Sequence, residues 1–272
     1  MKQLCLENEY LKVVILPDLG GRIDSFVNKK NNKNWVWNNN NLNKSKVSKY
    51  SEYDSNWQGG WEELFPNDAI EDFSWGKGLD HGELWSTSWS INKIETNFLE
   101  LKTTNLDSST IFNKSFKIFD NKLEVKYESD ILFEDYFLFK LHLAIPVTER
   151  IEVLCDYTSV NPVDHSFGNI INENKNFFIL EENSSLFDFA YVSLQNNNIL
   201  IKDEKSNTLK LSFFGELNHF WIFQTQGGWN NHNVIVLEPA SNSKKIIKDA
   251  IDDGSAVKGP MKFVCSYIVE LN

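Results

Sequence analysis

The feature that most constrains the fold is a two-residue alternation of apolar and polar side chains, repeated in many short runs. Successive side chains of a β-strand point to opposite faces, so this alternation indicates strands that are buried on one side. The runs "FNKSFKIF" and "LEVKY" flank Asp120-Asn121, a dipeptide that favours a tight turn, so a β-hairpin is expected there. Many short strands with turn residues between them predict an all-β sandwich or barrel. The expected strands are Leu11–Leu16, 22–28, Trp89–Ile94, Phe98–Thr103, Phe112–Phe119, Leu123–Tyr127, Tyr136–Ile145, Asn176–Leu180, Thr208–Phe214, His219–Gln224, Asn233–Leu237 and Lys262–Leu271.

Helix signals are weak in this chain. The best one is "SNSKKIIKDAIDDG", where Ser241 or Asn242 could cap a helix that Gly254 ends. The polar, asparagine-rich segment 28–55 is expected to be a loop. No Pro- or Ser-rich linker and no repeat of fixed period interrupts the 272 residues, so we expect one domain spanning 1–272.

Composition supports a large core and narrows the class of partner. Hydrophobic residues make up 41% of the chain and aromatic residues 14%, which is enough to fill a core. The net charge of −11 disfavours nucleic acid and anionic membrane surfaces but is no barrier to a neutral small molecule. Cysteine is scarce, no run of 18 apolar residues occurs, and "MKQLCLENEY" does not resemble a signal peptide. We therefore expect a cytoplasmic protein; the sequence does not indicate an oligomeric state.

Four stretches depart from plain alternation because they combine Trp, Gly and polar residues. They are "GGWEELFPND" (59–68), "LDHGELWSTSW" (79–89), "FLFKLHLAIP" (137–146) and "FWIFQTQGGWNNHNVIVLEP" (220–239). Aromatic faces pack against the apolar C–H faces of a sugar ring, while polar groups bind its hydroxyls. Acids and bases among such aromatics suggest proton transfer on a small polar molecule.

Together with "LPDLGGRIDSF" (16–26), these stretches resemble the galactose mutarotase (aldose 1-epimerase) superfamily in content and order. The resemblance implies a large antiparallel β-sandwich, the galactose mutarotase-like supersandwich, with a small-molecule sugar as substrate. It also implies catalytic roles at matched positions: Glu238 as general base, His142 as general acid, and His81 as a hydrogen-bond donor near the sugar ring oxygen. The reaction would interconvert the α and β anomers of an aldose without a cofactor or metal.

The chemistry is consistent with these residue types. Anomer exchange removes the proton of the C1 hydroxyl and protonates the ring oxygen, after which the ring opens and closes on its other face. A histidine titrates near neutrality, and a carboxylate becomes a useful base when burial raises its pKa. Each residue also has a plain structural interpretation: His142 as a core residue, His81 as part of a polar turn, and Glu238 as the end of a strand before Pro239. His165, His219 and His232 are expected to be structural or surface residues.

Six further residues are candidates to contact a sugar. A carboxylate of Glu62 or Glu63 could bind two hydroxyls, the Arg22 guanidinium could bind hydroxyls or pair with an acid, and three tryptophans could line the pocket. An equally good interpretation is that the acids are simply solvated and that the tryptophans pack in the core. The three tryptophans are Trp61, Trp85 and Trp229.

The departures from the family pattern leave the sugar open. Glu83, Leu84 and Trp85 stand where many relatives have an arginine after His-Gly, and Leu143 stands where many have Pro or Ser. No cluster of Arg and Lys accompanies the matched stretches, which disfavours a sugar phosphate. Two alternatives remain: a non-catalytic sugar-binding or sensing protein, and a glycoside hydrolase or lyase. A hydrolase needs two carboxyl groups about 5–10 Å apart, for which Glu238 with Glu62 or Glu63 is the available pair.

Overall fold

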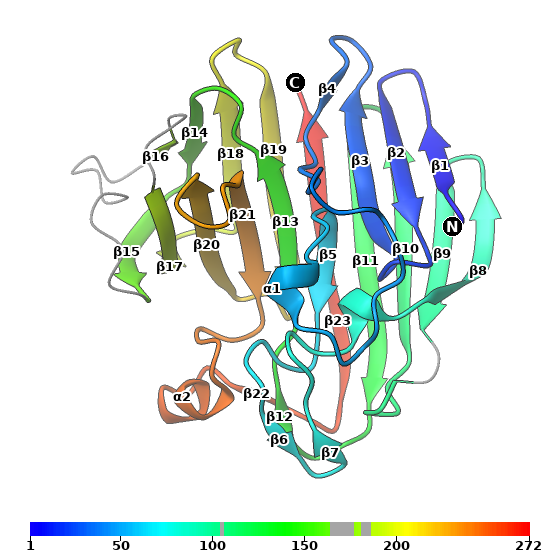
Figure 1. Ribbon diagram of the computed structural model, residues 1–272, viewed down its shortest axis with the longest axis vertical. Coiled ribbons are helices and arrows are strands. Elements are labelled where there is room, and N and C mark those ends of the chain that lie inside the picture. The colour runs from blue at the N-terminus through cyan, green and yellow to red at the C-terminus, as the bar shows by residue number, and fades with distance from the viewer. Residues whose placement is uncertain (104–105, 164–176, 181–185) are drawn as a thin grey trace.

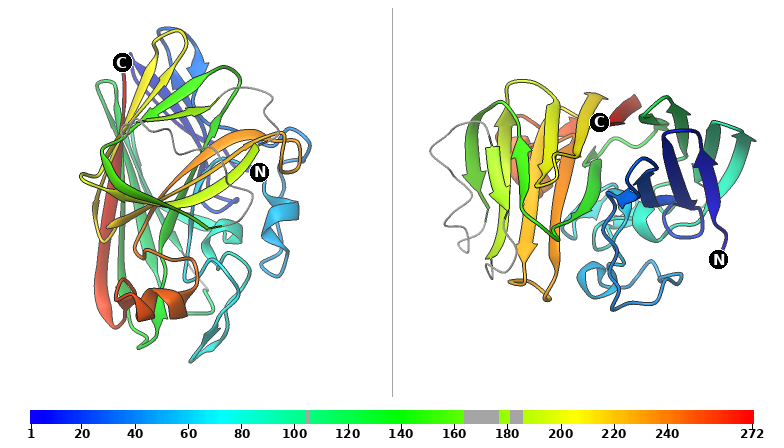
Figure 2. Two further views of the ribbon diagram at one scale, coloured as in Figure 1. Left: turned by 90° about the vertical axis from the view of Figure 1, so that its left-hand side faces the viewer. Right: turned by 90° about the horizontal axis from the view of Figure 1, so that it is seen from above.

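The computed structural model describes residues 1–103, 106–163, 177–180 and 186–272. Two large antiparallel sheets pack face to face, one behind the other in Figure 1 and edge-on in the left view of Figure 2. The expected all-β sandwich is confirmed. The only helices among the described residues are short, and none of them is long and apolar enough to cross a bilayer.

The first sheet carries the candidate site and has ten strands, in the order β1-β2-β3-β5-β13-β21-β20-β17-β15 with β4 paired to β3. Its strands are β1 (Leu4–Glu7), β2 (Leu11–Leu16), β3 (Arg22–Asn28), β4 (Lys33–Asn34), β5 (Trp61–Leu64), β13 (Lys140–Pro146), β15 (Tyr157–Pro162), β17 (Leu186–Leu194), β20 (His219–Gln226) and β21 (Asn233–Ala240).

The second sheet has nine strands, in the order β16-β14-β18-β19-β23-β11-β10-β9-β8. They are β8 (Trp89–Glu95), β9 (Phe98–Thr103), β10 (Phe112–Phe119), β11 (Lys122–Ile131), β14 (Ile151–Leu154), β16 (Phe177–Leu180), β18 (Asn198–Asp203), β19 (Thr208–Gly215) and β23 (Met261–Leu271). Two small ribbons, a 3₁₀ turn and two helices complete the described chain: β6 (Asp72–Phe73) with β7 (Gly76–Lys77), β12 (Tyr136–Phe137) with β22 (Val257–Lys258), Leu84–Ser86, α1 (Tyr53–Asn56) and α2 (Ile247–Asp252).

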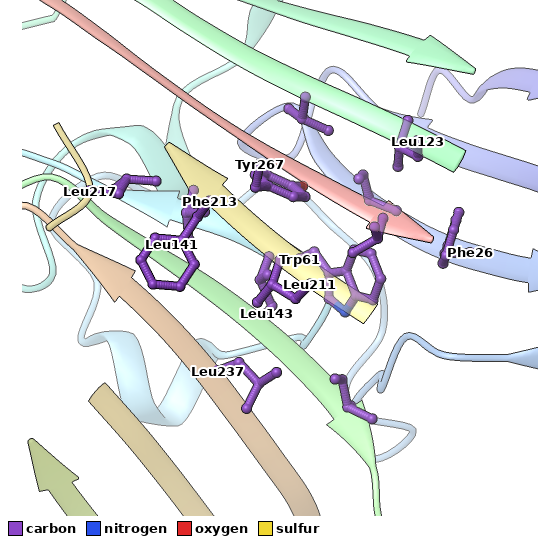
Figure 3. Close-up of a cluster of buried hydrophobic side chains, with 14 of the residues drawn as sticks. Phe26, Trp61, Leu123, Leu141, Leu143, Leu211, Phe213, Leu217, Leu237 and Tyr267 are labelled. Carbon is purple, nitrogen blue, oxygen red and sulfur yellow. The ribbon is translucent and has the colours of Figure 1, made fainter. Parts of the chain in front are cut away.

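The core lies between the two sheets and is built from alternate residues of their strands. Figure 3 shows Trp61, Leu141 and Leu143 of the first sheet facing Phe213 and Tyr267 of the second. All five side chains are buried. Because side chains alternate along a strand, the residues next to these inward-facing ones point to the outer face of the first sheet, where α1 lies (Figure 1).

Several local predictions hold and others are corrected. The hairpin at Asp120-Asn121 joins β10 and β11 as expected. The expected strand 136–145 is instead two strands in different sheets, β12 and β13. The expected helix begins only at Ile247. Neither Ser241 nor Asn242 caps it, because both side chains are buried and hydrogen-bonded to the backbone of 137–139, at the end of β12 and before β13.

The asparagine-rich segment 28–55 is mostly loop, but it also contains β4 and the start of α1. Figure 1 shows this segment passing in front of the first sheet between β4 and α1. The strands that were not predicted are β1, β4, β5, β6, β7, β14, β15, β17, β18 and β22. Asn176 of the expected strand 176–180, and also His165, lie outside the described residues.

Candidate active site

Three neighbouring strands of the first sheet set a row of ionisable side chains across its outer face. The register pairs Glu62 of β5 with His142 of β13. Strand β13 pairs with β21 so that Lys140 is opposite Ala240 and Leu143 is opposite Leu237, which sets Glu238 beside His142. Neighbouring strands are about 4.8 Å apart, so the register alone brings these side chains together from distant parts of the chain.

The side-chain contacts within this row are direct. His142 Nε2 lies 3.5 Å from Glu238 Oε1, and His142 Nδ1 lies 2.9 Å from the Tyr53 hydroxyl. The same hydroxyl donates a 2.5 Å hydrogen bond to Glu62 Oε1. The imidazole of His142 is therefore held between two carboxylates, with Glu238 in contact on one side and Glu62 linked through Tyr53 on the other.

Lys140 lies two residues before His142, and therefore on the same face of β13. Its ammonium group contacts Asp68 Oδ2 at 2.5 Å and Glu238 Oε2 at 2.7 Å. The two carboxylates and the ammonium are almost fully buried. The attraction between their opposite charges offsets the cost of removing them from water. This pairing fixes the orientation of the Glu238 carboxylate and leaves Oε1 toward His142.

His81 reaches the row from a tight turn. It has a φ of 57°, and the following Gly82 has a φ of 75° with its Cα so close to Phe65 that a Cβ would lie 2.2 Å from the Phe65 carbonyl oxygen. Only glycine fits there, which explains the His-Gly pair. The ring of His81 stacks on Tyr53 with centroids 4.0 Å apart, and its Nδ1 contacts Asp80 Oδ1 at 2.7 Å.

Burial and neighbouring charges give the ionisable groups different protonation tendencies. Burial raises the pKa of Glu238, although Lys140 opposes the shift. Burial, followed by the charge of Lys140, lowers the pKa of His142 well below its ordinary value, so its imidazole is neutral at pH 7. Burial alone would lower the pKa of His81, but the carboxylates of Asp68 and Asp80 more than offset it and raise that pKa. One neutral and one more basic imidazole thus flank the cavity.

Glu62 is the other unusual acid of the site. Burial raises its pKa to about 7, although the Arg22 charge and the Tyr53 hydroxyl favour the carboxylate. At neutral pH, Glu62 can therefore either donate or accept a proton through Tyr53.

These groups open into one cavity of about 210 Å³ on the outer face of the first sheet. The three predicted catalytic residues, His81, His142 and Glu238, all line it. Of the six predicted sugar contacts, only Trp229 lines it. Aromatic side chains and ionisable groups make up most of the remaining lining: Tyr53, Asp54, Trp57, Asp68, Lys140, Phe189, Phe223 and Lys245.

The placement of the other candidates corrects the sequence analysis. Trp61 and Glu63 point between the sheets because they alternate with Glu62 along β5, and both are buried. Glu63 pairs there with Lys114 at 2.7 Å and accepts a hydrogen bond from Tyr127. Neither residue can contact a ligand in the cavity, so Glu63 is also excluded as the second carboxylate of a hydrolase.

Arg22 and Trp85 lie behind the cavity and line a small hollow with Glu62. The Trp85 ring packs edge-on against Tyr53 with centroids 5.0 Å apart, so it supports the residue that holds His142. The buried guanidinium of Arg22 acts on the site through its charge, which favours the ionised form of Glu62. Both are supports of the site and not contacts of the cavity.

The sequence analysis missed Tyr53, Trp57, Asp68 and Lys140. Lys140 had a readable signal, because its two-residue spacing from His142 puts both on one face. The expectation that no cluster of Arg and Lys accompanies the matched stretches is also corrected, since Lys140 and Lys245 both line the cavity. Among the residues the structure describes, no group of three or more His, Cys, Asp or Glu side chains is placed to hold a metal ion.

Solved structures similar to this chain share one architecture. Slr1438 of Synechocystis sp. PCC 6803 superposes with a TM-score of 0.74 at 12% identity, over 100% of this chain and 96% of that one. A galactose mutarotase-like protein of Lactobacillus casei ATCC 334 gives 0.72 at 14% identity, over 100% of both chains. The GalM/aldose epimerase homologue of C. elegans gives 0.69 at 10% identity, over 100% of this chain and 98% of that one.

The chain has the galactose mutarotase-like fold. The expected supersandwich is therefore confirmed as an architecture. In sequence, residues 1–69 match a family described as a domain of unknown function, DUF5107, and no curated protein matches the chain. The matched segment contains Tyr53, Glu62 and Asp68 but not His81, His142 or Glu238.

Proposed function

We propose that the protein is an aldose 1-epimerase-like enzyme that interconverts the anomers of a neutral sugar by acid–base catalysis. The observation that carries this proposal is the contact of Glu238 and His142 at 3.5 Å on one wall of the cavity. The two oxygens that exchange protons in the reaction are bonded to the same carbon of the sugar. An acid and a base that serve them must therefore lie side by side, as these two residues do.

Glu238 acts as the base in this proposal. Its Oε1 takes the proton of the C1 hydroxyl, while Oε2 stays paired with Lys140. The raised pKa of Glu238 makes it a stronger base than an exposed carboxylate, and the charge of Lys140 favours its ionised form.

His142 delivers a proton to the ring oxygen. When Glu62 is protonated, it donates to Tyr53, Tyr53 donates to Nδ1, and Nε2 carries a proton that faces the cavity. As Nε2 gives its proton to the ring oxygen, Nδ1 receives one from Tyr53, which Glu62 replenishes. In this proposal His81, the more basic imidazole, donates a hydrogen bond to the same oxygen or to a neighbouring hydroxyl. Ring closure on the other face returns each proton.

The aromatic walls favour a sugar over other neutral polar molecules. Trp57, Phe223 and Trp229 line the cavity together with the ionisable row, and aromatic faces pack well against the C–H face of a pyranose. Lys140 also lines the cavity, but it is already paired with two carboxylates and offers no free charge to an anionic ligand.

The test is anomer exchange of an aldose panel, followed by NMR exchange spectroscopy. Wild type is expected to accelerate exchange of at least one aldose, and Glu238→Gln to lower kcat by about 10²–10⁴-fold. Glu95→Gln on the exposed edge strand β8 is the matched control and should keep full activity. Saturable sugar binding without accelerated exchange would show a binding protein instead, and release of a reducing end from an oligosaccharide would show a hydrolase.

A further inference from the structure

A second hollow of about 470 Å³ lies beside the candidate active site. The asparagine-rich segment, the end of β13 and the β20–β21 connection form its walls. Seven of its thirteen lining residues are asparagines, among them Asn38, Asn40 and Asn233, and Trp37 and His232 supply aromatic surface. We call this hollow the asparagine groove.

The groove is uncharged in a strongly charged protein. Asp, Glu, Lys and Arg make up 24% of the chain, which has a net charge of −11, yet none of them is among the described residues that line the groove. A side-chain amide both donates and accepts hydrogen bonds, as a sugar hydroxyl does. This lining suits a neutral polyhydroxylated ligand better than an ion, a nucleic acid or an apolar molecule.

Two amide oxygens of the groove lack a partner in the described structure. Asn38 Oδ1 and Asn233 Oδ1 are both buried, and neither has a hydrogen-bond partner among the described residues. The amide nitrogen of Asn38 is fixed by a 2.9 Å bond to the Asp24 carbonyl, so its oxygen has a set direction. A buried acceptor without a donor is costly, so each of these amides gains a hydrogen bond if it turns its oxygen toward the hydroxyl group of a bound ligand.

A continuous set of aromatic rings joins the groove to the main cavity. Trp57 and Trp229 line the cavity, whereas Trp37 and His232 line the groove. The Trp37 and Trp57 centroids are 4.7 Å apart, and those of Trp229 and His232 are 5.4 Å apart. Along β13, the four residues from His142 to Pro146 rise about 13 Å, the length of a few sugar units.

We infer that the asparagine groove is a subsite for the outer units of a neutral oligosaccharide whose reducing-end sugar occupies the main cavity. The inference rests on the proposed function for the placement of the reducing end. The rings between the two hollows would support the linking unit, and the amides would bind the hydroxyls of the units beyond it. The preferred substrate class is then a short neutral oligosaccharide with a free reducing end.

The test compares mono- and oligosaccharides on the full-length protein. The probes are glucose, galactose, maltose, cellobiose, lactose, maltotriose and cellotriose, each measured for anomer exchange by NMR and for binding by calorimetry. The variants are Asn233→Ala and Asn40→Ala in the groove, with Asn92→Ala on the exposed face of β8 as the matched control.

The expected result is a lower KM for at least one oligosaccharide than for its monosaccharide in wild type. Each groove variant should raise that KM by about 3- to 10-fold, the effect of one hydrogen bond, and leave the monosaccharide KM within about twofold. Equal KM values for the two classes, or equal effects of the variants on both, would overturn the inference and leave the proposed function standing.

If wild type accelerates anomer exchange of no sugar, the proposed function is overturned. The binding measurements then still test the subsite. Oligosaccharide binding that the groove variants weaken by about 3- to 10-fold would still support the subsite. Absence of binding by every probe, or binding that the groove variants do not change, would overturn it.

Discussion

The two faces of strand β5 carry neighbouring glutamates that have opposite surroundings. Glu62 points to the outer face of the sheet and joins Tyr53 and His142 beside a cavity. Glu63 points between the sheets, is fully buried and pairs with Lys114. Both acids are buried and both have a raised pKa, mainly because of burial.

The difference shows that a buried, perturbed acid does not by itself mark a functional site. The Glu63 pair fixes the packing of the two sheets, since Lys114 also bonds the Gly21 carbonyl and the Tyr127 hydroxyl bonds Glu63. The Glu62 row differs because its last members, His142 and Glu238, face open space that a ligand can fill. Variants at Glu62 and Glu63, or at their partners, can therefore be compared as matched tests of the outer and inner faces of one strand.

The largest effect is expected from Lys114→Met, which leaves the Glu63 carboxylate buried without its cation. We expect the free energy of unfolding to fall by about 3–5 kcal/mol. Sugar exchange per folded molecule should stay unchanged, because this pair does not contact the cavity. Chemical denaturation and NMR exchange measured on the same sample test both statements; a loss of activity in the folded fraction would contradict the separation of the two faces.

Lys140→Met removes the corresponding cation of the cavity face. We expect a loss of stability of about 3 kcal/mol, because Asp68 and Glu238 lose their partner. Without the ammonium, the pKa of Glu238 rises further, so the acidic limb of the pH–rate profile should move to higher pH. Measured profiles of kcat/KM check this; an unmoved limb would mean that Glu238 is not the base.

Glu62 should leave a signature in the pH dependence of stability. Its pKa rises from 4.5 to about 7 on folding, so the folded state binds more protons than the unfolded state between these values. Its contribution to stability is therefore fully present below pH 4.5 and is lost as pH rises through about 7. Between pH 5 and 7 this amounts to about 2 kcal/mol.

The Glu62→Gln variant isolates that contribution from the other titrating groups. As the pH rises from 5 to 7, the free energy of unfolding of the variant should decrease by about 2 kcal/mol less than that of wild type does. Denaturation series at several pH values measure the difference. Parallel wild-type and variant curves would show that Glu62 does not titrate in this range.

The smallest of these effects is expected from Tyr53→Phe, which removes the hydroxyl between Glu62 and His142. Losing this bond should cost about 1–2 kcal/mol in the transition state, a decrease of about 5- to 30-fold in kcat with little change in KM. Tyr50→Phe is the control, because Tyr50 is 75% exposed and does not line the cavity. Equal kcat values for Tyr53→Phe and wild type would remove Tyr53 from the proton path.

The sequence predicted the class of fold and the three central residues of the candidate site for different reasons. Period-two alternation indicated most strands directly, because each strand buries one face. His81, His142 and Glu238 were found through the resemblance, and their approach to one another depends on strand register, which a single sequence does not encode in any readable form. The resemblance to the family therefore pointed to these three residues, which the local sequence pattern did not.

The errors have identifiable causes in the sequence. Trp61 and Glu63 were assigned to the ligand because "WEEL" is apolar and acidic without clear alternation, so the face of each residue could not be read. Tyr53 was missed because it lies in a polar segment that lacks periodicity. Asp68 was missed because its partner, Lys140, is 72 residues away in sequence.

The central claim is that Glu238 and His142 act on one sugar in the main cavity, and a crystal structure with a bound aldose tests it most directly. The account predicts the C1 hydroxyl within about 2.6–3.2 Å of a Glu238 carboxylate oxygen and the ring oxygen within the same reach of the His142 imidazole. A sugar bound in the cavity with its C1 turned away from Glu238, or bound only elsewhere, would contradict the account.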